Sequence, residues 1–93
     1  MQDIKTISFN EGEKRELTAT INSKNADEVV VIASAEFELK KFSGEIAQQG
    51  ACEISGNEAT IFLDLAEKGS YELKTTFYVG REVIKKKRIV KVL

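Results

Sequence analysis

The stretch that decides the fold is residues 57–79, NEATIFLDLAEKGSYELKTTFYV. Apolar side chains recur at every second position in both of its halves, and a period of two is that of a β-strand. The alternating apolar residues are Ala59, Ile61, Leu63 and Leu65, followed by Tyr71, Leu73, Phe77 and Val79. The stretch therefore predicts two strands that are joined by a corner at residues 66–70.

The corner ends in Gly69-Ser70-Tyr71. Glycine adopts positive φ without steric cost, so it suits a sharp change of direction. In immunoglobulin-like sandwiches, a tyrosine just past such a corner donates its hydroxyl to the corner backbone and stands two residues before a buried position. Leu73 would be that buried position. We therefore predict a tyrosine corner at Tyr71; the alternative is an ordinary half-buried strand aromatic.

A hairpin turn precedes this stretch, with Gly56-Asn57 at its tip. A glycine followed by asparagine between two alternating segments is a signal for a two-residue β-hairpin loop. Such a loop pairs Ile54 with Ala59 and Cys52 with Ile61. Both pairs are apolar, so the predicted turn agrees with the alternation of the strands.

A second hairpin turn follows the stretch, with Gly80-Arg81 at its tip. A two-residue loop here pairs Val79 with Glu82. The same register carries two cations of residues 85–88 toward the core, where they would face Thr75 and Leu73. We therefore predict a bulge, or a departure from the sandwich, within residues 85–88.

Earlier parts of the chain also have β patterns, in residues 4–9, 15–22, 29–42 and 45–54. We expect a break near Ala33-Ser34, because strands usually run for five or six residues. A kink or bulge is expected at Gln48-Gln49-Gly50, and a polar loop at residues 23–28. One apolar face of the third segment consists of Val29, Val31, Ala33, Ala35, Phe37 and Leu39, and Ile46 points inward in the fourth.

Seven or eight short strands separated by turns predict an all-β fold, an immunoglobulin-like antiparallel β-sandwich with two sheets. No helical period runs long enough to compete. Because 93 residues suit one domain, residues 1–93 are expected to form a single sandwich domain.

Composition argues against several classes of function. The net charge of −1 provides no general attraction to nucleic acid or membrane, and the chain has no histidine, the commonest general base and metal ligand. The single Cys52 is expected to be a buried structural thiol. We expect no enzyme activity, cofactor or metal. Residues 1–5 lack the pattern of a secretory signal, so synthesis in the cytoplasm is expected.

Two groups of side chains are candidates for binding a partner. Phe62 and Tyr78 have the parity opposite to the core, and outward aromatics on adjacent strands can anchor a partner. Ordinary cross-strand packing on a solvated sheet is the alternative. Lys85 and Lys87 belong to a basic run that either guards a sheet edge or contacts a partner.

The chain resembles small immunoglobulin-like sandwich modules of tailed-phage structural proteins in Gram-positive bacteria. The stretches that carry the resemblance are Phe9-Asn10-Glu11-Gly12-Glu13, Ser34-Ala35-Glu36-Phe37, Ile54-Ser55-Gly56-Asn57, Gly69-Ser70-Tyr71-Glu72-Leu73 and Gly80-Arg81-Glu82. Such modules include baseplate or tail-fibre attachment domains and head or neck accessory proteins. The resemblance implies an assembly role without catalysis.

The leading hypothesis is a structural or assembly module of a phage or prophage particle, associated with the virion after synthesis. Its partners would be other protein subunits, including copies of itself. Neither specific nucleic acid nor a membrane is expected as a partner. The alternative is a carbohydrate- or cell-wall-binding module that uses Phe62 and Tyr78 as a stacking platform.

Overall fold

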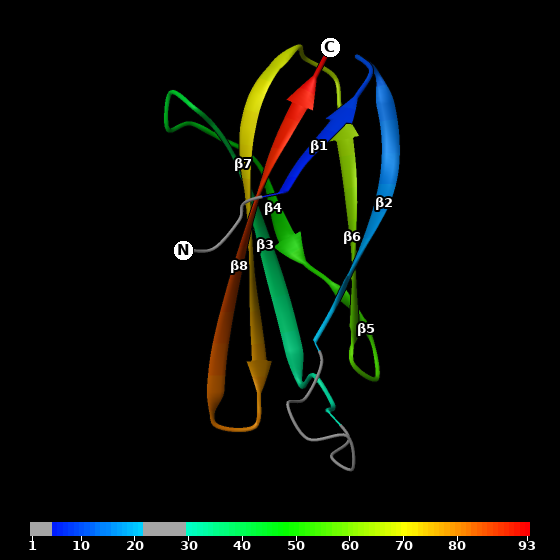
Figure 1. Cartoon of the computed structure of the whole chain (residues 1–93), viewed down its shortest axis with the longest axis vertical. Helices are drawn as coiled ribbons and strands as arrows, with labels where there is room; N and C mark the ends of the chain where they lie inside the picture. The colour runs from blue at the N-terminus through cyan, green and yellow to red at the C-terminus, as the bar shows by residue number, and fades with distance from the viewer. Residues whose placement is uncertain (1–4, 22–29) are drawn as a thin grey trace.

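Eight β-strands form two sheets packed face to face, and no helix occurs in residues 5–21 and 30–93, which the computed structural model describes (Figure 1). In chain order the strands are β1 (Lys5–Phe9), β2 (Glu13–Thr20), β3 (Ser34–Lys41), β4 (Ile46–Ala51), β5 (Glu53–Ser55), β6 (Glu58–Leu65), β7 (Gly69–Val79) and β8 (Glu82–Val92). The predicted loop at residues 23–28 lies outside the described residues.

The five-stranded sheet has the order β1-β8-β7-β3-β4, and the three-stranded sheet has the order β2-β6-β5. All neighbouring strands are antiparallel except β1 and β8, which run parallel. The predicted immunoglobulin-like β-sandwich is therefore confirmed, with one parallel pair added at the edge of the larger sheet. The chain crosses from one sheet to the other at the corner between β6 and β7.

The corner is a tyrosine corner, as predicted. The Tyr71 hydroxyl donates a hydrogen bond of 2.8 Å to the backbone carbonyl of Glu67, and Tyr71 is only 4% exposed. Leu73, two residues later, is buried. The hydrogen bond ties the start of β7 to the loop that carries the chain between the sheets.

Replacing Tyr71 with phenylalanine keeps the ring and removes this hydrogen bond. We expect the free energy of unfolding to fall by about 1 kcal/mol, the usual net value of one partly buried hydrogen bond. Urea unfolding measures the change. The control is Tyr78→Phe, which removes a hydroxyl that bonds an exposed carboxylate. Equal losses of stability in the two variants would contradict a structural role for the Tyr71 bond.

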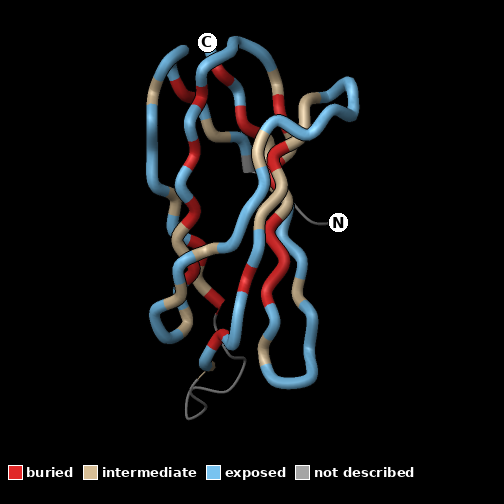
Figure 2. The backbone as a smooth tube through the Cα atoms, turned by 180° about the vertical axis from the view of Figure 1, so that it is seen from behind, coloured by how far each residue is buried: buried red, intermediate tan, exposed pale blue. Residues whose placement is uncertain are grey.

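The core lies between the two sheets and has two parts. Figure 2 shows buried residues alternating with more exposed ones along the strands, and exposed hairpin ends. One part consists of Phe9, Leu39, Ile61, Leu63, Leu65, Tyr71, Leu73, Val90 and Val92. The other consists of Ala19, Ile21, Ile32, Ala35, Ala59 and Phe77. Cys52 packs against both, half-buried as a free thiol.

Both predicted hairpins form, with glycine at the first position of each loop. Gly56 and Gly80 have φ of 60° and 57°, and no other residue type has positive φ in the described ranges, so the signs match type II′ turns. Ile54 pairs with Ala59 as predicted. The predicted pair of Cys52 with Ile61 does not form, because the β5–β6 ladder ends one residue earlier, at Glu53.

The predicted bulge in residues 85–88 is wrong. Strand β8 pairs with β7 without interruption, and Thr75 faces Lys86 while Leu73 faces Arg88. The Lys86 side chain stays exposed, and its Nζ donates a hydrogen bond of 3.1 Å to the carbonyl of Thr20, the last residue of β2. A long aliphatic stem lets the ammonium leave the core, so the ladder can remain regular.

The predicted break at Ala33-Ser34 is confirmed, because β3 begins at Ser34. The described residues just before it connect both sheets: the N–H of Ile32 donates to the carbonyl of Gly56, and that of Ala33 donates to the carbonyl of Tyr78. Because the chain bonds first one sheet and then the other, the alternation of buried and exposed side chains shifts by one residue here. Ile32 is therefore buried, whereas Val31 is 62% exposed and Ala33 is exposed, contrary to the predicted face.

The predicted kink at Gln48-Gln49-Gly50 does not form at these residues. One irregularity lies before them and another lies after them. The β3–β4 register shifts at Ala47, which has no partner in the β3–β4 ladder, and the chain leaves the larger sheet at Cys52. Residues 48–51 between these points pair regularly with β3. Ile46, predicted to point inward, lies on the rim and is 45% exposed.

Candidate protein-interaction surface

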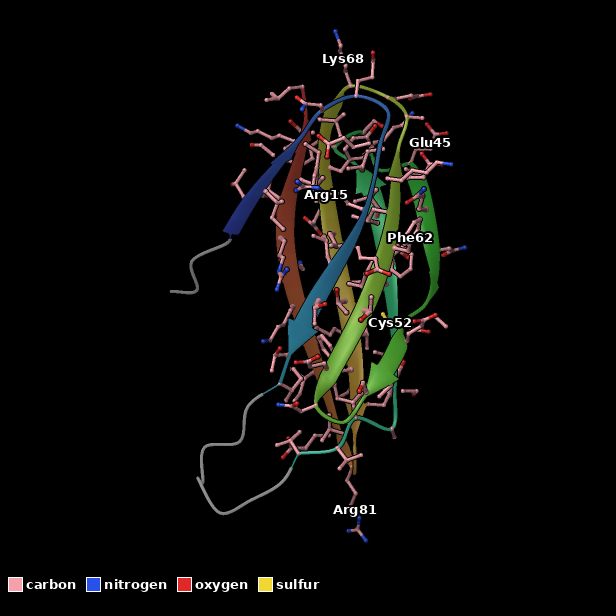
Figure 3. All side chains as sticks on the ribbon, turned by 90° about the vertical axis from the view of Figure 1, so that its right-hand side faces the viewer. Arg15, Glu45, Cys52, Phe62, Lys68 and Arg81 are labelled. Atoms are coloured by element: carbon pink, nitrogen blue, oxygen red, sulfur yellow. The ribbon has the colours of Figure 1, made fainter. Side chains whose placement is uncertain are left out.

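The structure separates the predicted site residues into two groups. Tyr78, Lys85 and Lys87 are exposed on β7 and β8 of the five-stranded sheet. Phe62 lies on β6 of the three-stranded sheet and is 57% exposed (Figure 3). The expectation that Phe62 and Tyr78 share one face is wrong, because β6 and β7 belong to different sheets. Their outward parity therefore directs them to opposite sides of the sandwich.

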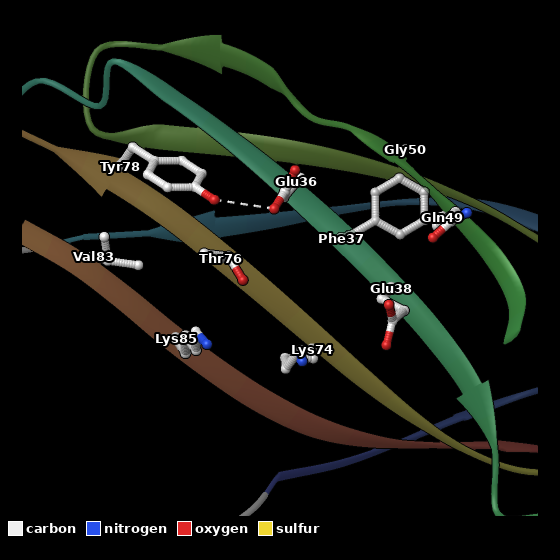
Figure 4. A pocket seen from close by; sticks show the side chains of 10 residues that line it. All are labelled: Glu36, Phe37, Glu38, Gln49, Gly50, Lys74, Thr76, Tyr78, Val83 and Lys85. Atoms are coloured by element: carbon white, nitrogen blue, oxygen red, sulfur yellow. Dashed lines mark hydrogen bonds between the residues drawn. The ribbon is translucent and has the colours of Figure 1, made fainter. Parts of the chain in front are cut away.

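A shallow concavity of about 510 Å³ lies on the outer face of the five-stranded sheet (Figure 4). Its floor is Thr76 on β7, which is only 7% exposed. Cross-strand register places Glu36 on one side of Thr76 and Lys85 on the other. The lining residues are Glu36, Phe37, Glu38, Gln49, Gly50, Lys74, Thr76, Tyr78, Val83 and Lys85.

Tyr78 closes one end of the concavity. Its hydroxyl donates a hydrogen bond of 3.1 Å to Oε1 of Glu36, and the dashed line in Figure 4 marks this bond. Val83 is the cross-strand partner of Tyr78 and is also exposed. The ring of Tyr78 is thus oriented by a specific contact and lies beside a second apolar group, as an anchor for a binding partner requires.

Charges of opposite sign line the two sides of the concavity. Glu36 and Glu38 stand on β3, whereas Lys74 and Lys85 stand on β7 and β8; Lys87 lies farther along β8, outside the concavity. Glu38 forms an ion pair of 3.2 Å with Lys40, and Lys87 lies 3.9 Å from Glu72. The separation of charge is therefore confined to the concavity, where the acidic groups come from β3 and the basic groups from β7 and β8.

Lys74 and Lys87 face each other directly across the β7–β8 ladder. Like charges in opposed positions of a sheet destabilise it modestly. Lys74 also has Glu38 opposite it on β3, so the basic side is partly balanced by the acidic strand. A partner group with negative charge over β8 would add further compensation.

The hydrogen bond to Glu36, and then the Glu36 charge, raise the pKa of Tyr78 above its ordinary value of 10.0. Because the neutral phenol is favoured in the folded state, this contribution to stability is present below pH 10 and is lost as the pH rises through the folded pKa. Titrating the Tyr78 ring by NMR should show the raised pKa. Glu36→Gln should move it back toward 10; an unchanged pKa in that variant would contradict the assignment.

The described residues contain neither a cluster of metal-ligating side chains nor an activated thiol. No group of three or more His, Cys, Asp and Glu that could hold a metal ion occurs in them. Burial, with a smaller effect of the Glu36 charge, raises the pKa of the Cys52 thiol, which disfavours the reactive thiolate. Residues 5–21 and 30–93 also include no helix that is long and apolar enough to cross a membrane.

Sequence reasoning missed Glu36, Thr76 and Val83 as parts of this surface. The alternation of β3 already placed Glu36 on the outer side, but only the sheet register brings its carboxylate to Tyr78. Thr76 gave no signal, because a threonine on an outer face is usually solvated. It is buried here because longer side chains stand on both sides of it.

No family model matches the sequence, and no curated protein matches it. Several solved chains share the fold, including two that align over nearly all of this chain. One is CopC from Methylosinus trichosporium OB3b, which has 14% sequence identity and a TM-score of 0.69 over 97% of this chain and 84% of CopC. The other is the endo-beta-1,4-mannanase from Thermotoga petrophila, which has 9% identity and a TM-score of 0.64 over 98% of this chain but only 18% of the mannanase chain. At these identities the likeness concerns the fold alone.

Proposed function

We propose that this protein is a non-catalytic assembly module that binds another protein subunit through the outer face of its five-stranded sheet. The observation that carries the proposal is the concavity between an acidic and a basic strand, with Tyr78 held at its end by Glu36. An oriented aromatic beside charges of both signs provides an anchor together with electrostatic selection of the partner.

The partner surface that fits this face has the inverse charge order. Basic groups would lie over Glu36 and Glu38 on β3, and acidic groups would lie over Lys85 and Lys87 on β8. Charge order of this kind selects one orientation of the partner, because the reversed orientation places like charges together.

The carbohydrate-binding alternative lacks its expected platform. A stacking surface built from two aromatics needs both rings on one side of the molecule, whereas Phe62 and Tyr78 lie on different sheets. The concavity is lined mainly by charged and polar side chains, which suits a polar protein surface.

The setting that we propose is a phage or prophage particle. The support for it is the resemblance of the stretches around Phe9, Glu36, Gly56 and Tyr71 to tailed-phage sandwich modules. In such a particle the module would join neighbouring subunits, and mass spectrometry of particles purified after prophage induction should detect the chain.

The binding test begins with capture of the partner from the native cell, followed by reconstitution from the two purified proteins. We expect Tyr78→Ala to weaken binding roughly 30-fold, the effect of losing about 2 kcal/mol from an aromatic anchor. The double variant Lys85→Glu, Lys87→Glu should weaken it further and reverse the contribution of β8 to its salt dependence, because attraction to acidic partner groups becomes repulsion. Calorimetry at low and at high salt measures both effects.

Phe62→Ala is the matched control, because it removes an exposed aromatic from the opposite sheet. It should leave the affinity within about twofold of the original, as expected for a residue outside the interface. Loss of binding in Phe62→Ala with no loss in Tyr78→Ala would contradict the proposed face.

A further inference from the structure

The edge of the five-stranded sheet at β4 differs from the other sheet edges of the molecule. The sheet order ends at β4, so this strand has a ladder partner on only one side within the described residues. Its sequence, IAQQGA, has no charged side chain, although 31% of the chain is charged. An uncharged edge strand is a template for another strand unless charges, bulges or shortness protect it.

The other edges have such protection. Strand β2 contains Glu13, Lys14, Arg15 and Glu16, strand β5 has three residues, and β1 has five residues and begins with Lys5. On β4 the bulge at Ala47 protects only the beginning of the strand, whereas residues 48–51 are regular. The open part of the edge, residues 48–51, is therefore uncharged and regular.

The direction of the backbone groups on this edge follows from the ladder. The N–H of Cys52 donates to the carbonyl of Ala35 on β3, and successive residues of an antiparallel strand point alternately toward and away from their partner. Gly50 and Gln48 accordingly face β3. Gln49 and Ala51 direct their N–H and C=O groups to the open edge.

A cleft of about 360 Å³ lies beside this edge, between β4 and the end of β6. Its floor is apolar and includes the buried side chains of Leu39, Leu65 and Tyr71. Its rim carries the ion pair of 2.9 Å between Lys41 and Glu67. A strand added to β4 would direct every second side chain to the inner side of the sheet, and those beside Ile46, Ala47 and Gln48 would meet the cleft.

Gln48 bonds the part of β6 that extends beyond the short strand β5. The Gln48 amide donates to the carbonyl of Asp64 at 2.9 Å and accepts from the N–H of Asp64 at 3.2 Å. One side chain thus satisfies both backbone groups of a β6 residue, as a neighbouring strand would do. This pair of hydrogen bonds connects the two sheets at the cleft. It does not use the backbone groups of β4 that face the open edge.

We propose that β4 receives an extended segment of a partner protein as an added strand, with an apolar side chain of that segment in the cleft. Backbone pairing with Gln49 and Ala51 would provide affinity, and the cleft would provide specificity. A second copy of β4 fits poorly, because its inward positions are Gln48 and Gly50, neither of which has an apolar side chain to contact Leu39, Leu65 and Tyr71 at the floor. This surface is separate from the outer face, so either proposal can fail alone.

The test uses the full chain and a displayed library of random peptides of about ten residues, long enough to form a strand. Selected peptides should share an apolar residue and should slow hydrogen exchange at the Gln49 and Ala51 amides. Each selected peptide is then made in two forms, with alternate backbone nitrogens methylated on one edge or on the other. The form methylated on the edge that pairs with β4 should lose at least tenfold in affinity, and the form methylated on the other edge should retain it. Side-chain contacts are the same in both forms, so the difference measures backbone pairing.

Ala51→Pro removes an N–H that β3 does not use, and proline is tolerated on an edge strand. It should weaken peptide binding at least tenfold, whereas Tyr78→Ala should leave it unchanged. Equal binding of the two methylated forms would overturn the proposal without reliance on any variant. A dimer that Ala51→Pro converts to monomer in the absence of peptide would also overturn it, because the occupant would then be a second copy.

Discussion

Phe77→Ala is expected to lower the free energy of unfolding by about 3–5 kcal/mol, the largest effect of any single substitution considered for this protein. Phe77 is fully buried, and three of the five other residues in its part of the core are alanines: Ala19, Ala35 and Ala59. Its ring is therefore the largest side chain in this part of the core. Because a domain of this size has a total stability of roughly 5–15 kcal/mol, the variant should lose between about a fifth of that stability and nearly all of it.

Urea unfolding followed by circular dichroism measures the loss, and Phe62→Ala is its matched control. Phe62 is the same residue type in a strand of similar length, but it is exposed. Its loss should change stability by no more than about 0.5 kcal/mol. Similar losses for the two phenylalanines would mean that the alanine-lined part of the core is not packed around Phe77.

Ala59→Leu is expected to lower the free energy of unfolding by about 1–3 kcal/mol, the usual cost of overpacking a core. Ala59 is fully buried on β6, between Ala19 on β2 and Ile54 on β5. Leucine is ordinarily more favourable than alanine in a strand, so loss of stability would show that the small side chain is required by packing.

The matched control is Ala66→Leu, at an exposed position in the corner after β6. It adds the same atoms to the surface and should change stability by less than about 0.5 kcal/mol. Thermal unfolding of both variants in parallel provides the comparison. A stable Ala59→Leu protein would indicate that the two sheets can separate to accommodate a larger side chain.

Features set by neighbouring residues could be predicted from the sequence. The pairing of Ile54 with Ala59 and of Val79 with Glu82 follows from two short loops and the alternation beside them. The Tyr71 hydrogen bond spans only four residues, so its spacing could be recognised before the structure. Local chemistry determines such features, because few alternatives satisfy both the turn and the pattern.

The candidate surface could be predicted only in part. Parity correctly placed Tyr78 outward, but parity alone does not tell to which sheet a strand belongs. Tyr78 consequently meets Glu36, a residue 42 positions earlier in the chain, and lies far from Phe62 in the architecture. The β4 edge was also missed, because a segment becomes an edge only when its neighbours are known.

The stretch of residues 57–79 illustrates which features the sequence alone determines and which it does not. Its alternation and its Gly-Ser-Tyr corner by themselves determined two strands, their buried faces and the corner between them. The tertiary structure decided which strands became neighbours, how Lys86 reached solvent without a bulge, and which edge remained open. The physical reason is range: side-chain direction depends on adjacent residues, whereas sheet order depends on the packing of segments that are distant in the chain.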